Sequence, residues 1–122
     1  MLHHAALEIS PDHVADDSRF WTLAGFEEVD VPEALRDSYT WFEKAGTQIH
    51  LVQTENPVIP VVGHVAIVAR DFEETLKRLV DGGFEADERR ELWGARRVKL
   101  SSPSGHKVEI MAAAPSRSAK SA

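Results

Sequence analysis

Two segments, one at the start of the chain and one near its middle, alternate apolar and polar positions as a half-buried β-strand does. One face of segment 4–9 and one face of segment 64–69 carry only apolar side chains, and the opposite face begins with His4 and His64, respectively. The repeated pattern predicts two strands, each with helices covering its apolar face and a histidine leading the other face.

Two further segments alternate with the same period. Residues 47–52 place His50, and residues 107–111 place Glu109, on the face opposite the apolar one. Both segments are predicted to be strands, and the stretch "SPSG" before the second suits a type I turn with proline second and glycine fourth.

The order of these patterns occurs twice. "HAALEIS" lies over "HVAIVAR", "LAGFEEVD" over "DGGFEADE", and "GTQIHL" over "GHKVEI". In the second half, helical spacing followed by a Gly-Gly pair predicts a helix whose apolar positions are Phe72, Leu76, Leu79 and Val80. The first half shows a weaker helical pattern with apolar positions at Val14, Trp21 and Ala24. Each half therefore runs strand, helix, Gly-Phe, two extended segments and a closing strand.

The parity of the alternation places four potential ligands on the faces that helices leave uncovered. They are His4, His50, His64 and Glu109. If the two sheets curl toward each other, these side chains line one concave surface, and each half supplies one ligand from its first strand and one from its last.

Composition narrows the possible functions. With 122 residues, the chain suits one domain with an ordinary core. It has no cysteine, so any metal must be bound by imidazole and carboxylate groups. The net charge of −6 argues against a nucleic-acid partner. The sequence shows neither a membrane-spanning stretch nor a secretory signal pattern, so we expect a cytoplasmic protein without a membrane partner.

The repeat also predicts the organisation of the domain. We expect a single domain over residues 1–113, with module one at 1–54, a linker at 55–62 and module two at 63–113. The small, polar, weakly basic residues of 114–122 are predicted to be a disordered tail.

Four motifs carry a resemblance to a known family. "HHAALEI", "FWTLAGFEEV", "GHVAIVARD" and "SPSGHKVEI" occur in this order and resemble the vicinal oxygen chelate superfamily. That superfamily includes glyoxalase I, methylmalonyl-CoA epimerase, extradiol dioxygenases, fosfomycin-resistance thiol transferases and bleomycin-resistance proteins. The resemblance implies an α+β fold of two βαβββ modules that form a cupped mixed sheet around a metal-binding cavity, usually in a homodimer.

Carried over by position, the resemblance implies a set of metal ligands: His4, His50, His64 and Glu109. Family members bind Ni, Co, Zn, Mn or Fe(II) and use the ion to chelate two adjacent oxygens of a small-molecule substrate. The expected activity is therefore a metal-dependent lyase or isomerase reaction of the glyoxalase or epimerase type. Glyoxalases and epimerases usually carry Glu or Gln at the position of His50, which argues against a glutathione-dependent glyoxalase.

Two alternatives stay open. His50 is either a fourth ligand or an outer group that moves a proton. Without it, His4, His64 and Glu109 form the two-histidine, one-carboxylate triad of an extradiol-type Fe(II) dioxygenase. Bleomycin-resistance-type members keep the fold without a metal, so a protein that only binds a drug or metabolite is the other alternative.

Further residues are candidates for catalysis and substrate binding. Glu8 shares the ligand face and is a candidate general base, as is Glu109 when released from the metal. Arg97 and Lys99 are candidates for binding an anionic substrate group, and Tyr39 for lining the cavity. The remaining histidines are expected outside the site: His3 faces away by alternation, and His13 and His106 are assigned to the surface.

Overall fold

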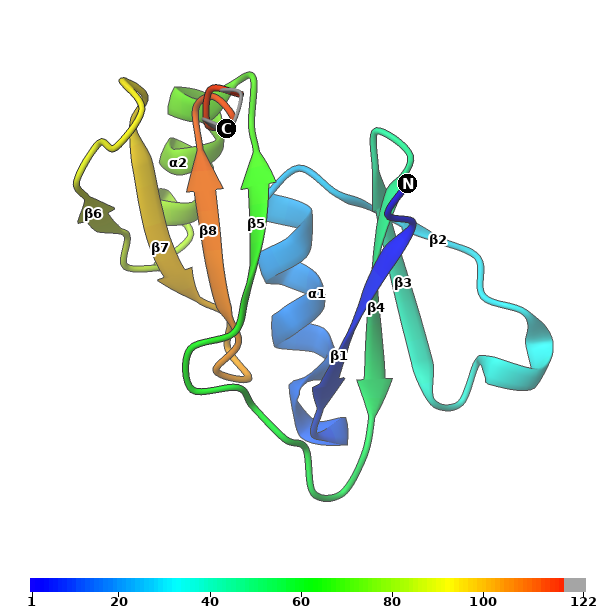
Figure 1. Ribbon diagram of the computed structural model, residues 1–122. Coiled ribbons are helices and arrows are strands. Elements are labelled where there is room, and N and C mark those ends of the chain that lie inside the picture. The colour runs from blue at the N-terminus through cyan, green and yellow to red at the C-terminus, as the bar shows by residue number, and fades with distance from the viewer. Residues whose placement is uncertain (118–122) are drawn as a thin grey trace, which may run out of the picture.

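The computed structural model describes residues 1–117, which form two modules of the same plan (Figure 1). Module one comprises β1 (His4–Ile9), the 3-10 helix η1 (Pro11–His13), α1 (Val14–Leu23), β2 (Glu27–Val29), the 3-10 helix η2 (Glu33–Leu35), β3 (Tyr39–Lys44) and β4 (Thr47–Gln53). Module two comprises β5 (His64–Val68), α2 (Phe72–Asp81), β6 (Asp87–Arg89), β7 (Arg97–Ser101) and β8 (Lys107–Met111).

Each module holds one four-stranded mixed sheet, with the orders β1-β4-β3-β2 and β5-β8-β7-β6. The first and last strands of each module pair in parallel, and the other neighbours pair antiparallel. The register is also the same in the two sheets, because Ala6 lies opposite His50 as Ala66 lies opposite Glu109. The predicted α+β fold of two βαβββ modules is confirmed.

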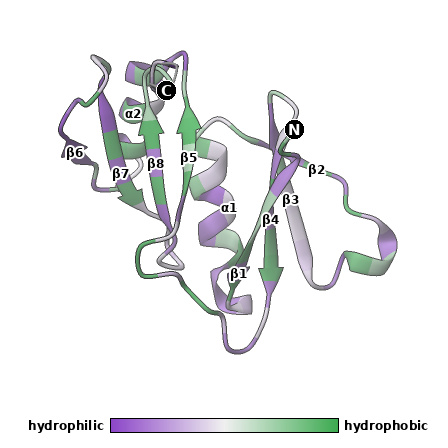
Figure 2. Ribbon diagram, in the orientation of Figure 1, coloured by the Kyte–Doolittle hydropathy of each residue, from purple (hydrophilic) through white to green (hydrophobic). Residues whose placement is uncertain are grey.

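One hydrophobic core extends through both modules. Helix α1 lies between the two sheets in Figure 1, and its fully buried Phe20 packs edge-to-face against both Trp21 and Phe84, with ring centroids 5.2 and 5.1 Å apart. Figure 2 shows apolar residues along β5 and β8 and hydrophilic residues on the short outer strand β6. The sheets therefore bury one face each against the helices and leave the other face open.

The helix predicted after β5 is α2, but its buried stripe differs from the expected one. Phe72 and Leu79 are buried as predicted, and Thr75 is buried between them. Val80, the last apolar position of the predicted helix, is instead 49% exposed. Gly83 follows the helix with φ of +97°, a conformation that favours glycine and ends the helix where the Gly-Gly pair predicts.

Polar contacts join the two modules near the predicted turn. The turn forms, with Gly105 N–H donating to Ser102 O at 2.8 Å. Its Ser104 donates both N–H and Oγ–H to the fully buried Asp17 carboxylate of α1, at 2.9 and 2.6 Å. Burial raises the pKa of Asp17, against the opposing effect of these hydrogen bonds.

His106 strengthens the same junction, and its assignment to the surface is wrong. Its side chain is buried, and its Nε2–H donates to Glu8 O of β1 at 2.7 Å. Because the turn packs against module one, a residue that directly follows a turn glycine is enclosed here.

Residues 114–117 follow β8 without helix or strand, and the rest of the expected disordered tail lies outside the described residues. The segment between β4 and β5, expected as the linker, contains no regular element. None of the helices described is long and apolar enough to cross a membrane.

Candidate metal and substrate site

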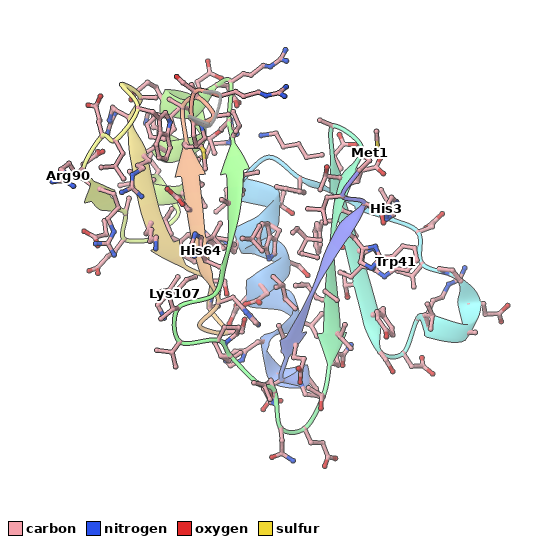
Figure 3. The ribbon with its side chains drawn as sticks, viewed as in Figure 1. Met1, His3, Trp41, His64, Arg90 and Lys107 are labelled. Atoms are coloured by element: carbon pink, nitrogen blue, oxygen red, sulfur yellow. The ribbon has the colours of Figure 1, made fainter. Side chains whose placement is uncertain are left out.

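The structure places the four predicted ligands on the open faces of the sheets, but in two separate pairs. His4 and His50 lie on the sheet of module one, and His64 and Glu109 lie on the sheet of module two. Figure 3 shows His64 on one sheet, away from His3 and Trp41 on the other. Within residues 1–117, no group of three or more histidine, cysteine, aspartate or glutamate side chains is arranged to hold a metal ion. Within the described residues, the four predicted ligands thus form two separate pairs, called here the two half-sites, rather than one cluster.

The pair on module two brings an imidazole and a carboxylate together. His64 Nδ1 lies 3.1 Å from Val62 O, and since a carbonyl only accepts hydrogen bonds, Nδ1 must carry the proton. In the neutral ring, the lone pair is then on Nε2, which lies 3.3 Å from Glu109 Oε1. Two acceptors facing each other are stabilised by a positive charge between them, either a proton on His64 or a bound ion.

Arg97 secures the other oxygen of the Glu109 carboxylate. Its Nη1 donates to Glu109 Oε2 at 2.9 Å, its Nε donates to Arg90 O at 2.9 Å, and its guanidinium lies 5.5 Å from the centre of the Trp93 ring. Both side chains of the ion pair are largely buried, with 16% exposure for Arg97 and 7% for Glu109. The residue expected to bind substrate is therefore engaged in orienting the carboxylate.

The pair on module one is part of a stack of aromatic rings. The His50 ring lies between Trp41 and His4, with centroids 4.1 and 4.0 Å away and interplanar angles of 6° and 14°. Burial, then the nearby His4 and His3, lower the pKa of His50 to about 4. His50 is therefore uncharged at neutral pH, the form in which an imidazole binds a metal.

The stacked geometry restricts how His4 and His50 can bind an ion. An imidazole lone pair lies in the plane of its ring, so two nearly parallel rings 4.0 Å apart do not both point to one ion. In addition, His50 Nε2 is already bonded to Gln48 Oε1 at 2.7 Å. One ring must turn before both can bind the same metal.

His3 lies beside this pair, so the expectation that it faces away is wrong. Its Nδ1 is 3.0 Å from His4 Nδ1, and the two rings meet edge-to-face. Residue 3 precedes the first residue of β1, and the alternation of the strand does not govern its side chain.

Three other predicted residues share the open faces of the sheets. Glu8 is exposed, and its Oε1 accepts a hydrogen bond from Val58 N–H of the connecting segment at 3.3 Å. Tyr39 lies opposite Val52 at the same end of the sheet. Lys99 lies directly opposite Glu109.

Sequence reasoning missed two residues beside the predicted ligands. Gln48 holds His50, and Lys107 lies opposite His64 in the strand register. The alternation of β4 and β8 could have identified both residues, because Gln48 and Lys107 each lie two positions from a predicted ligand and on the same face of the strand.

The donor atoms present suit a divalent first-row metal. Imidazole nitrogen and carboxylate oxygen together bind Mn, Fe, Co, Ni and Zn, and the selection among them depends on geometry and availability. The residues of the two half-sites therefore fit such an ion chemically, provided that both halves contribute to one site.

Comparison with known proteins identifies the family. Residues 2–110 match the model of the Glyoxalase/Bleomycin resistance protein/Dioxygenase superfamily. Because this match spans most of the chain, the protein belongs to that superfamily, and the resemblance inferred from its motifs is confirmed. No curated protein matches the sequence.

Solved structures share the fold at low sequence identity. A putative glyoxalase family protein from Bacillus anthracis has a TM-score of 0.83 and 22% identity, covering 91% of this chain and 93% of its own. The fosfomycin resistance protein FosX from Listeria monocytogenes has a TM-score of 0.72 and 21% identity, covering 93% of each chain. Lactoylglutathione lyase from Agrobacterium tumefaciens has a TM-score of 0.65 and 16% identity, covering 91% and 92%. At these identities the likeness shows the fold alone.

Proposed function

We propose that the protein is a divalent-metal-dependent lyase or isomerase, of the glyoxalase or epimerase type, for a small substrate with vicinal oxygens. The observation that carries this proposal is the His64–Glu109 pair, in which Nε2 of the imidazole and Oε1 of the carboxylate face each other at 3.3 Å. Membership of a superfamily that contains glyoxalases and dioxygenases agrees with it.

The proposed site joins the two half-sites through a second copy of the chain. In such a homodimer, His64 and Glu109 of one copy meet His4 and His50 of the other. The charges of the open faces support this pairing. The face of module one carries Glu8 and Glu43, and that of module two carries Lys99 and Lys107 beside the ion pair of Arg97 and Glu109.

The residues of the chain have distinct roles in the proposed reaction. A bound divalent ion would polarise a substrate oxygen as a Lewis acid. Arg97 keeps the Glu109 carboxylate in place, and Lys99 supplies positive charge for an anionic substrate group. Tyr39 lines the same face, and we assign proton transfer to Glu8, with Glu109 as the second carboxylate.

The first test is the metal content of untagged protein, measured by elemental mass spectrometry with His64→Ala alongside. We expect near-stoichiometric Ni, Co, Zn, Mn or Fe in the native protein and its loss in the variant. We also expect the metal-loaded protein, but not the chelated one, to turn over α-hydroxy or α-keto carbonyl substrates. Equal turnover by thoroughly chelated protein contradicts the proposal. Failure to bind metal even after reconstitution also contradicts it, and would favour a metal-free binding protein.

One observation favours a second candidate, an extradiol-type Fe(II) dioxygenase. The stacking of His50 and its bond to Gln48 would keep it off the metal if neither ring turns. His4, His64 and Glu109 then form a two-histidine, one-carboxylate triad. Anaerobic loading with Fe(II), followed by exposure to a catechol and oxygen, separates the two candidates, because only the dioxygenase cleaves the ring.

A further inference from the structure

A chain of hydrogen bonds connects His50 to a carboxylate on the neighbouring strand. Gln48 Nε2 donates to Glu43 Oε1 at 3.0 Å, and Gln48 Oε1 lies 2.7 Å from His50 Nε2. Glu43 and Gln48 face each other across β3 and β4, and His50 lies two positions along β4 on the same face. The three side chains therefore form one continuous row of donors and acceptors.

The chemistry of the carboxylate decides the direction of every bond in this row. An ionised carboxylate accepts hydrogen bonds and donates none, so Gln48 must turn its NH₂ group toward Glu43. The amide oxygen then faces His50, and an oxygen that accepts requires a proton on His50 Nε2.

We propose that Glu43 and Gln48 are positioning residues that fix His50 as the tautomer protonated on Nε2, so that Nδ1 carries its only lone pair. The faces of the ring are covered by Trp41 and His4, and its Nε2 edge is bonded to Gln48. Nδ1 is thus the atom through which His50 contacts an ion or a substrate. This consequence rests on the proposed function, whereas the tautomer itself does not.

The two modules fix opposite tautomers of their histidines, with the proton on Nδ1 of His64 and on Nε2 of His50. Val62 O requires the proton of His64 on Nδ1 and leaves the lone pair of the neutral ring on Nε2, whereas Gln48 leaves the lone pair of His50 on Nδ1. The strand register places Lys107 and Ser101 of module two where module one has Gln48 and Glu43. An amide–carboxylate relay is therefore a property of module one, even though the backbone repeats.

The contacts of the stack also indicate which ring would be able to turn if both histidines bound one metal ion. His50 is buried and held on both faces and at Nε2, whereas His4 is exposed, and among residues 1–117 its ring nitrogens have one hydrogen-bonding contact, with His3. The ring free to turn is that of His4, and His50 stays fixed.

The test is long-range ¹H–¹⁵N correlation NMR of uniformly labelled, metal-free protein at pH 7.5, with His50 assigned by the loss of its signals in His50→Gln. We expect a protonated Nε2, an unprotonated Nδ1 and a slowly exchanging Hε2. A proton on Nδ1, or fast averaging between the two tautomers, would overturn the proposal. Because the sample holds no metal, a failure of the proposed enzymatic function leaves this result unaffected.

Three variants then test the relay itself, each checked for folding by its amide spectrum. Glu43→Lys replaces an acceptor with a donor, so Gln48 is expected to turn over and the His50 population to shift mainly to the Nδ1–H form. Gln48→Glu keeps an acceptor beside His50 and is expected to retain Nε2–H. The matched control is Glu27→Lys, which makes the same charge change directly opposite Glu43 on β2. Equal effects of Glu43→Lys and Glu27→Lys on the His50 signals would overturn the role of Glu43.

Discussion

The two sheets share strand order and register but hold their ligand positions by different forces. On module one, His50 is a neutral ring within an aromatic stack and an amide bond. On module two, Glu109 is an anion paired with Arg97 and facing His64. The repeated backbone therefore determines where each predicted ligand lies. The side chains around that ligand determine whether a neutral or a charged group is stable there. This difference predicts that the two half-sites respond differently to substitution and to pH.

The largest expected effect is that of Glu109→Ala, which removes both a proposed ligand and the partner of Arg97. We expect metal affinity to fall by more than the roughly 10- to 100-fold typical of outer-sphere partners. Isothermal titration with Zn(II) or Mn(II) measures the loss, and Glu91→Ala, an exposed glutamate, is the control. Unchanged affinity would show that module two is not the ionic half of a metal site.

Acid should destabilise module one through His50. Its pKa is about 4 in the folded protein and 6.5 in the unfolded chain, so between these values the unfolded chain binds the additional proton. Stability present above about pH 6.5 is therefore lost as the pH falls toward 4, by up to about 3 kcal/mol.

Denaturant unfolding at pH 7.5 and pH 4.5 measures this loss, with His50→Gln as the comparison. The variant should lose less stability over the same interval than the native protein does. Equal losses would mean that His50 does not contribute to the pH dependence.

The junction between the modules should also be sensitive to substitution, through Asp17. Asp17→Ala leaves the N–H and hydroxyl of Ser104 without their acceptor, and we expect a loss of about 2 kcal/mol in the free energy of unfolding. Asp17→Asn keeps an acceptor and removes the buried charge, so its cost should be below about 1 kcal/mol. Urea unfolding measures both, and equal costs would contradict the assigned hydrogen bonds.

The smallest expected effect is that of Arg97→Lys. A lysine keeps the charge but cannot donate to Glu109 and Arg90 O at once, so the carboxylate becomes less well oriented. We expect about tenfold weaker metal binding, the lower end for a lost supporting contact. The matched control is Arg89→Lys, since Arg89 lies directly opposite Arg97 and is exposed. An equal effect of both substitutions would point to general charge rather than orientation.

The alternation of apolar positions was enough to predict the faces of the sheets. His4, His50, His64 and Glu109 all lie on the open faces because a strand residue's face follows from its parity. The glycines after α2 and before β8 likewise marked where the chain turns. Strand faces and glycine turns depend on residues close together in the chain, so they can be predicted from the sequence.

The rest depended on contacts between distant segments. Asp17 and Ser104 are 87 positions apart, and no local pattern relates them. Predicting the stack of His50 with Trp41 and His4 required knowledge of the order of strands within the sheet, which the alternation of apolar positions does not specify. Similarly, parity placed one pair of ligands on the open face of each sheet, but it did not reveal that the two pairs stay apart within the described residues instead of lining one concave surface.

The parallel pairing of β1 with β4 has a consequence for the order of events during synthesis. The stack of His4 and His50 requires residues from both ends of module one, so it forms only after β4 has been made. All strands of that sheet, however, precede residue 54, and β5 begins at His64. Even so, one hydrophobic core extends through both modules, and Phe20 of α1 packs against Phe84, so the sheet of module one gains its full packing only after module two has been made. Because a domain folds as a unit, the stack of His4 and His50 is expected to become fixed only once the whole domain has been synthesised.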